Sequence, residues 1–299
     1  MRNRIETLKK EKNACILAHY YAPAEAQEIA DYVGDSFYLA KVAKENDADV
    51  IVFCGVNFMG ESAKILCPDK KVLMPDLSAD CPMAHMVKEG KIDEIRERFS
   101  DLAVACYINS TAELKCQSDV CVTSSNAVKI VKSLPQKNIF FIPDRNLGRF
   151  VAAEVPEKNI ILNDGCCPIH AEMTAESLKV VMKIHPEALV LCHPECEAEI
   201  LELSHFSGST AEIIDFAKSS DAEEFIICTE EGVAHKLKCD NPDKEFYFPS
   251  PCPVCKDMKL NTLENILKVL ENEENQVEVD DNTRMGALVP LDRMLELGK

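Results

Sequence analysis

Short apolar runs alternate with stretches in which apolar residues recur at helical spacing, and the same order occurs three times along the chain. The runs predict strands and the stretches between them predict helices. The predicted strands are Ala14–His19, Val50–Cys54 and Lys71–Pro75, then Leu102–Tyr107, Asn138–Pro143 and Asn159–Asn163, and then Ala188–His193, Glu224–Thr229 and Glu245–Phe248. Apolar strands that alternate with helices are typical of parallel sheets covered on both faces. We therefore predict an α/β fold of three homologous α/β/α sandwich units with small parallel sheets.

Three sets of anchor residues define the period of this repeat. Within each set the members are separated by 86 and 88 residues. The sets are His19, Tyr107 and His193 at the end of the first strand, Ser36, Ser124 and Thr210 at the start of the next helix, and Cys81, Cys167 and Cys255 beyond the third strand. A fixed period indicates a repeated architecture. We expect units at residues 1–86, 87–171 and 172–257.

The stretch after the third unit, residues 258–299, shows helical spacing of apolar residues at Leu263–Leu270 and Leu291–Leu297. We expect this C-terminal helical segment to pack back on the core, against the first or third unit.

Composition and charge exclude several classes of function. The 299 residues carry a net charge of −18, which argues against broad binding to nucleic acid or to a membrane surface. Apolar runs are far shorter than a membrane span, and the charged start MRNRIETLKKEK does not resemble a secretory signal. We therefore expect a cytoplasmic protein, in which the 15 cysteines are thiols or metal ligands rather than disulfides.

The anchors point to one shared site. Ligands of parallel α/β sheets bind beyond the carboxyl ends of the strands, where all three sets of anchors fall. Three cysteine ligands suit zinc, or an iron–sulfur cluster with one iron left open. Hydroxyls at helix starts suit an anion, although ordinary N-capping explains any single one of them. Chance spacing among so many cysteines is the competing explanation of the third set.

The motifs around these anchors resemble those of the quinolinate synthase family over almost the whole chain. They are AHYY, GVNFMGESAKIL, DCPMA, YINSTAELK, TSSNAVKIV, IPDRNLGR, GCCPIH, CHPEC, GSTAEII and CKDMKLNTLE. The resemblance implies three units around a pseudo-threefold axis and a [4Fe–4S] cluster held by Cys81, Cys167 and Cys255. Cys167 is preferred to Cys166 because it holds the family's place in the pattern from Gly165 to His170. Cys255 is preferred to Cys252 because of its spacing to Met258.

The same resemblance implies the substrates and the residues that act on them. The implied substrates are iminosuccinate and dihydroxyacetone phosphate, with iminosuccinate supplied by L-aspartate oxidase or aspartate dehydrogenase. They condense to quinolinate, and the open iron acts as a Lewis acid. It implies catalytic roles for Tyr21, Glu195 and His193. It implies substrate contacts for His19, Ser36, Tyr107, Asn109, Ser124, His193, Glu195 and Thr210.

Two other functions remain open at this stage. One is a different [4Fe–4S] dehydratase that acts on a small carboxylate. The other is a metal- or redox-binding regulator that uses the C-x-x-C pair Cys252 and Cys255, which alone is a weak signal. A regulator needs no threefold set of polar residues at strand ends, so we favour an enzyme.

Overall fold

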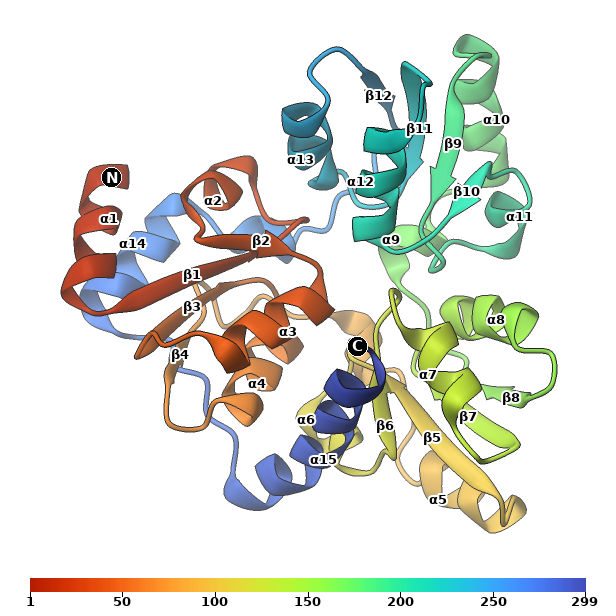
Figure 1. Ribbon diagram of the computed structural model, residues 1–299, viewed down its shortest axis with the longest axis horizontal. Coiled ribbons are helices and arrows are strands. Elements are labelled where there is room, and N and C mark those ends of the chain that lie inside the picture. The colour runs from red at the N-terminus through yellow and green to blue at the C-terminus, as the bar shows by residue number, and fades with distance from the viewer.

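The computed structural model describes residues 1–299 and contains three parallel sheets, each with four strands (Figure 1). The first sheet has β1 (Ala14–His19), β2 (Tyr32–Gly34), β3 (Val50–Cys54) and β4 (Lys71–Leu73). The second has β5 (Leu102–Tyr107), β6 (Val120–Val122), β7 (Asn138–Ile142) and β8 (Asn159–Leu162). The third has β9 (Leu189–Cys192), β10 (Phe206–Ser207), β11 (Glu224–Cys228) and β12 (Glu245–Tyr247).

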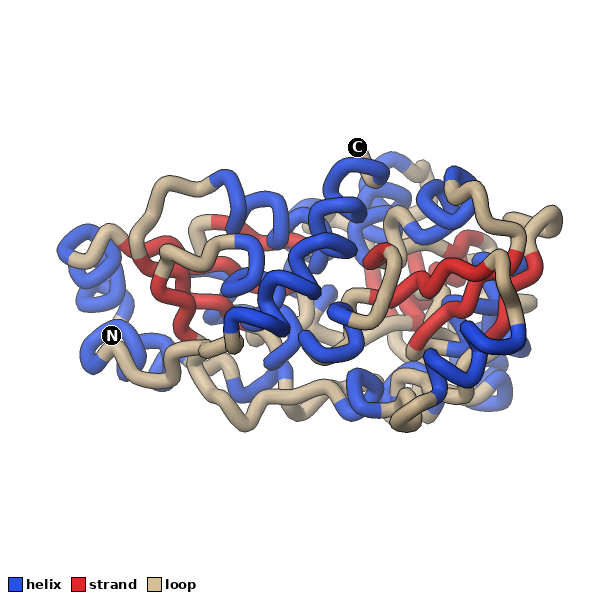
Figure 2. Tube along the Cα trace, turned by 90° about the horizontal axis from the view of Figure 1, so that it is seen from below, coloured by secondary structure: helices blue, strands red, loops and turns tan.

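All three sheets have the same strand order, β2-β1-β3-β4 in the first, β6-β5-β7-β8 in the second and β10-β9-β11-β12 in the third. They form three lobes around a common centre (Figure 1). The view turned by 90° shows that the lobes lie side by side rather than stacked (Figure 2). The predicted fold class is therefore confirmed.

Helices cover both faces of the sheets. Those of the first lobe are α1 (Arg2–Glu11), α2 (Ala24–Ile29), α3 (Ser36–Glu45) and α4 (Asn57–Leu66), with a 3-10 helix at Pro82–His85. The second lobe has α5 (Lys91–Arg98), α6 (Ala112–Cys116), α7 (Ala127–Ser133), α8 (Arg145–Glu154) and α9 (Pro168–Ala171). The third has α10 (Ala175–Ile184), α11 (Ala198–Leu201), α12 (Thr210–Ser219) and α13 (Val233–Asp240). The C-terminal segment has a 3-10 helix at Met258–Leu260, then α14 (Leu263–Asn272) and α15 (Asp281–Leu297).

The alternation of side chains along β1 shows how one sheet divides its residues between two cores. Ile16 and Ala18 pack with residues of α1, α2 and α14, whereas Cys15 and Leu17 face the opposite core with α3 and α4. Successive strand residues point to opposite faces, so a strand covered on both sides is apolar at every position. This explains why the strands appear in the sequence as unbroken apolar runs.

The structure also differs from the predicted elements. Each lobe contains one strand that the sequence pattern did not predict: β2, β6 and β10, of three, three and two residues. Runs this short carry no periodicity. Ser36 and Thr210 open α3 and α12, but Ser124 lies in a turn before α7.

The C-terminal helices lie on two different lobes. α14 packs against α1 and β3 of the first lobe, as expected. α15 packs mainly against α6 and β6 of the second lobe, which was not expected, and it also contacts α4 of the first lobe, which was expected. Figure 1 shows α15 between the first and second lobes. At Gly286 an added Cβ would meet Sγ of Cys116 in α6, so glycine lets the two helices approach without moving that side chain.

None of the helices combines the length and apolarity needed to cross a membrane.

Glu273, just after α14, predicts a pH-dependent contribution to stability. Its carboxylate pairs with Lys12 at 2.6 Å and with Lys71, and these hydrogen bonds lower its pKa to about 2. A lowered folded-state pKa stabilises the fold above the usual pKa near 4.5, and this gain is lost as pH falls towards 2. Glu273→Gln should lower the free energy of unfolding by about 0.5–1 kcal/mol at pH 7, because the pair is partly exposed.

Urea unfolding at pH 7 and at pH 3 measures this effect. The difference between wild type and Glu273→Gln should shrink strongly at the lower pH. The exposed Glu278, for which no ion pair is found, gives the control Glu278→Gln with unchanged stability. An equal difference at both pH values would contradict the assignment.

Candidate functional site

A cavity at the centre of the molecule is lined by residues from all three lobes. Every residue that the sequence predicted for the site lines it: His19, Tyr21, Ser36, Cys81, Tyr107, Asn109, Ser124, Cys167, His193, Glu195, Thr210 and Cys255. The carboxyl ends of the strands explain this convergence. His19 ends β1, Tyr107 ends β5 and His193 directly follows β9. The anchors of the repeat are thus brought to one place, while their roles remain to be assigned.

Two histidines from different lobes have the same local geometry. Nδ1 of His19 accepts a hydrogen bond from the main-chain N–H of Tyr21 at 3.2 Å, and Nδ1 of His193 accepts one from the N–H of Glu195 at 3.3 Å. Burial lowers the pKa of His19 to about 3 and that of His193 to about 4. Both rings are therefore neutral near pH 7, with the proton on Nε2. Each offers one N–H donor away from its own main chain.

The three predicted cysteines form a group of thiols on the wall of the cavity. Burial raises the pKa of Cys81 to about 12, and the neighbouring Cys255 adds to that shift. Burial also raises the pKa of Cys167, with contributions from Glu195 and Cys81, and that of Cys255. These thiols stay protonated unless a metal displaces their protons. Three sulfur donors that influence one another electrostatically suit zinc or an iron–sulfur cluster.

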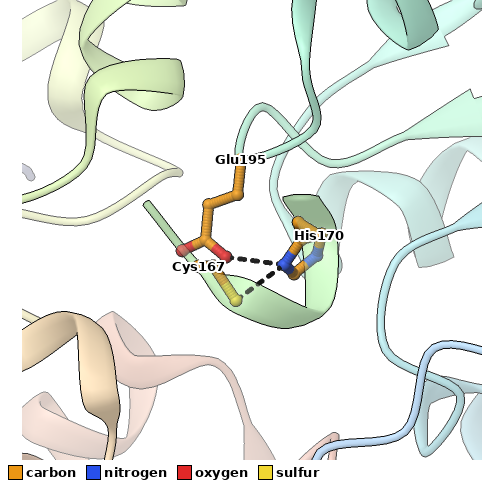
Figure 3. Close-up of side chains that lie close together, drawn as sticks. All are labelled: Cys167, His170 and Glu195. Carbon is orange, nitrogen blue, oxygen red and sulfur yellow. Dashed lines mark hydrogen bonds and ion pairs between the residues drawn. The ribbon is translucent and has the colours of Figure 1, made fainter. Parts of the chain in front are cut away.

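A second possible metal site shares one of these sulfurs. The ligand atoms of Cys167, His170 and Glu195 lie within 4.8 Å of one another (Figure 3). Nδ1 of His170 lies 2.9 Å from Oε2 of Glu195 and 3.2 Å from Sγ of Cys167. His170 and Glu195 are buried. No role was predicted for His170, although it lies three residues after Cys167, one helical turn along α9.

A chain of hydrogen bonds joins Tyr21 to this group. The hydroxyl of Tyr21 lies 2.6 Å from Oγ1 of Thr229 and 2.8 Å from that of Thr210. Nε2 of His170 lies 2.9 Å from the same Thr229 hydroxyl. Since Nδ1 of His170 faces Glu195, the chain runs from a phenol of the first lobe to a carboxylate of the third. Thr229 was absent from the predicted site because no polar anchor of the other units corresponds to it.

The titrating groups at the ends of this chain have shifted pKa values. Burial and the nearby Glu195 raise the pKa of Tyr21 and of Tyr107, so both phenols remain protonated. Burial alone would raise the pKa of Glu195, but the facing His170 outweighs it and lowers that pKa. Glu195 is therefore a carboxylate, surrounded by groups that can donate protons or hydrogen bonds to it.

The cavity wall contains carboxylates but no Lys or Arg side chain. An anionic ligand must therefore bind to hydroxyl, imidazole and main-chain N–H donors, or to a bound metal. Ser36 and Thr210 occupy the first positions of α3 and α12. The N-caps Asp35 and Ser209 already accept hydrogen bonds from the N–H groups of Tyr38 and Glu212, so the N–H groups of Ser36 and Thr210 themselves are left for an anion. Oδ1 of Asn109 is buried without a hydrogen-bond partner, as expected for an atom reserved for a ligand.

The first and third lobes meet closely beside Tyr21. Lys259 donates a hydrogen bond to the main-chain oxygen of Tyr21 at 3.0 Å and pairs with Glu230 at 2.9 Å. At Gly232, an added Cβ would lie 2.7 Å from the same oxygen of Tyr21, so only glycine permits this approach. These contacts fix the position of Tyr21 relative to the third lobe.

Comparison with known proteins shows which family shares this chain's sequence. The model of the family described as quinolinate synthetase A protein matches residues 3–296. Proteins named quinolinate synthase from Caldicellulosiruptor saccharolyticus and Fusobacterium nucleatum are 52% and 53% identical over 297 residues, covering 99% of this chain and 98% and 99% of theirs. The protein of that name from Clostridioides difficile is 49% identical over 296 residues, 99% of this chain and 97% of its own.

Among solved structures, a ZnuA deletion mutant with bound zinc aligns over 89% of this chain and 100% of its own, with 14% identity and a TM-score of 0.19. A score this low bears on neither the fold nor the site.

Proposed function

The chain belongs to the quinolinate synthetase A protein family, and on that premise we propose that it is an enzyme that condenses iminosuccinate with dihydroxyacetone phosphate. The products are quinolinate, phosphate and two molecules of water. The observation that carries the proposal is the convergence of three cysteines with neutral histidines, phenols and the buried carboxylate of Glu195 in a single cavity.

Cys81, Cys167 and Cys255 would hold a [4Fe–4S] cluster. Their donor set fits such a cluster, because three thiolates, one from each lobe, leave one iron without a protein ligand. When bound, the cluster supplies Lewis-acid chemistry, which polarises a hydroxyl or carbonyl oxygen. The remaining chemistry belongs to the side chains around it.

The donors of the cavity are suited to bind two small anions. We assign the substrate carboxylates and the triose phosphate to the Nε2–H groups of His19 and His193 and to the hydroxyls of Ser36, Ser124 and Thr210. The helix starts at Ser36 and Thr210 add main-chain N–H groups. Asn109 and Tyr107 complete the set, since Oδ1 of Asn109 has no other partner and the Tyr107 phenol stays protonated.

Proton transfer is assigned to the two ends of the hydrogen-bonded chain. Glu195 is a carboxylate and accepts a proton from the substrate, and Tyr21 is a phenol and donates one. Thr229 and His170 fix the positions of these two side chains, because Thr229 contacts Tyr21 and His170, and His170 contacts Glu195. His193 orients the substrate beside Glu195 through its remaining N–H, because its Nδ1 is already occupied by the main chain.

An anaerobic assay tests this function. The purified protein, reconstituted with iron and sulfide, should form quinolinate from iminosuccinate and dihydroxyacetone phosphate, with release of phosphate. A sample with a full cluster but no quinolinate would refute the proposed substrates and favour another dehydratase of small carboxylates. A protein that binds zinc and no cluster would refute both.

A further inference from the structure

One position of the repeat carries a buried acid in two of the three lobes. It lies two residues beyond the end of β3, β7 and β11, which end at Cys54, Ile142 and Cys228. The residues there are Val56, Asp144 and Glu230. Asp144 is 0% exposed and Glu230 is 1% exposed. A carboxylate is costly to bury, so its presence at the same place in two lobes needs an explanation.

The two carboxylates divide their oxygen atoms in the same way. Oδ1 of Asp144 accepts a hydrogen bond from the N–H of Leu147 in α8 at 2.6 Å, and Oδ2 accepts one from the N–H of Cys167 at 3.2 Å. Oε2 of Glu230 accepts from the N–H of Gly232 at 2.7 Å, at the start of α13, and Oε1 accepts from the N–H of Cys255 at 2.9 Å. In each lobe, one oxygen holds the following helix and the other holds a cysteine of the site.

Helix capping explains only half of this arrangement. Asp144 is the N-cap of α8 and needs one oxygen for that task. Glu230 is not the N-cap of α13, which is Gly232. What links both acids to the site is therefore the hydrogen bond to a cysteine N–H. It joins Asp144 to Cys167 and Glu230 to Cys255.

We propose that Asp144 and Glu230 are positioning residues, each of which fixes the main chain of one metal-ligand cysteine to the end of the sheet in its own lobe. Asp144 does not line the cavity, and Glu230 lines it but already uses both carboxylate oxygens, for the N–H groups of Gly232 and Cys255 and for Lys259. The cysteines' role as ligands rests on the proposed function, whereas the two carboxylate contacts do not.

In the first lobe, the cysteine N–H binds the carboxylate of the adjacent residue instead. The side chain of Val56 cannot accept a hydrogen bond, and the N–H of Cys81 donates to Oδ1 of its neighbour Asp80 at 2.8 Å. The main chain also links this loop to α4, since the N–H of Asn57 donates to the oxygen of Ala79 at 2.8 Å. Each cysteine N–H thus binds a carboxylate, but only two of these carboxylates lie at the repeated position.

Glu230 has a further partner that extends its effect. Lys259 pairs with Oε1 of Glu230 and also binds the main-chain oxygen of Tyr21. The loop of Cys255 in the third lobe and the loop of Tyr21 in the first are therefore held by one ion pair. Disturbing Glu230 should loosen both.

Hydrogen–deuterium exchange of the metal-free protein tests the proposal without relying on a cluster. In Glu230→Ala, amides of the segment 252–258 should exchange about tenfold faster than in wild type, the factor that about 1.4 kcal/mol provides. Glu230→Gln, the variant with the milder change, should give an intermediate rate because its amide oxygen can serve only one of the two N–H groups. The adjacent Glu231 also pairs with Lys259 but does not bind Cys255, so Glu231→Gln should leave this segment unchanged.

Asp144→Asn separates positioning from capping. Asparagine caps a helix as well as aspartate does, so exchange within α8 should stay unchanged while the segment 165–170 exchanges about tenfold faster. Wild-type exchange rates in both cysteine segments of Asp144→Asn and Glu230→Gln would overturn the proposal.

Reconstituted protein gives the second measurement. Iron should pass to a chelator about tenfold faster from Glu230→Ala than from wild type or Glu231→Gln. Equal rates in all three would overturn the link between Glu230 and metal retention. A wild-type protein that takes up no cluster would refute the proposed function. The hydrogen–deuterium exchange of the metal-free protein would still test whether Asp144 and Glu230 position the two cysteines.

Discussion

Replacing Cys81 by alanine is expected to abolish the cluster and all formation of quinolinate. Its thiol is one of the three that line the cavity and the first lobe's only contribution to the proposed ligand set. Loss of one of three thiolates leaves the cluster with two protein ligands, and unoccupied iron positions expose it to solvent and to chelators. Iron analysis after anaerobic reconstitution should fall from about four atoms per chain in wild type to near zero.

The chain provides matched controls next to the other two ligands. Cys166 precedes Cys167 directly, and Cys252 lies in the same C-x-x-C pair as Cys255. Cys167→Ser and Cys255→Ser should lose the cluster, while Cys166→Ser and Cys252→Ser should keep it. A cluster that survives Cys167→Ser but not Cys166→Ser would show that the motif was assigned to the wrong residue.

The long central strands could be predicted from sequence because of how their side chains are buried. β1, β3 and β5 have the predicted bounds, since every residue of such a strand faces one of two cores and the run is apolar throughout. The edge strands β2, β6 and β10 pair on one side with a single neighbour and are too short to show a pattern. β2 and β10 are also only partly buried, whereas all three residues of β6 are buried, so β6 was missed because of its length alone.

The helix α15 shows a different limit. It runs from Asp281 to Leu297, whereas only 291–297 was predicted. Gly286 and Pro290 interrupt the expected helical pattern, and proline removes one hydrogen bond from the helix. Packing against α6 and β6 compensates for that loss. Such compensation depends on the partner surface, which the local sequence does not reveal.

The residues of the site also fall into those that the sequence predicted and those that it did not. Its twelve predicted residues were found through the repeat and the family motifs, because the same strand ends recur in each lobe. His170 and Thr229 were missed, since each acts in one lobe only and has no repeated counterpart. Glu230 was missed for another reason: its equivalence with Asp144 is visible in the sequence, but its bond to the Cys255 N–H is not.

Glu195→Gln should retain the cluster but lower kcat by about 10²–10⁴-fold, the range expected when a general base is removed. Glu195 is buried and charged, and it faces the protonated phenols of Tyr21 and Tyr107 as well as His170. Glutamine has nearly the same shape and can still accept a hydrogen bond from His170. It cannot accept a proton from the substrate near pH 7. KM should therefore change much less than kcat.

The control for this variant is Glu199→Gln, which removes an exposed acid from α11, four residues further along the same loop and helix. Its kcat should match that of wild type, so that a loss in Glu195→Gln cannot be attributed to the change in net charge. Steady-state kinetics and iron content are measured on the same samples. If Glu195→Gln kept both its iron and its kcat, proton transfer would have to be reassigned, and Tyr21 and His170 would be the remaining groups of the hydrogen-bonded chain.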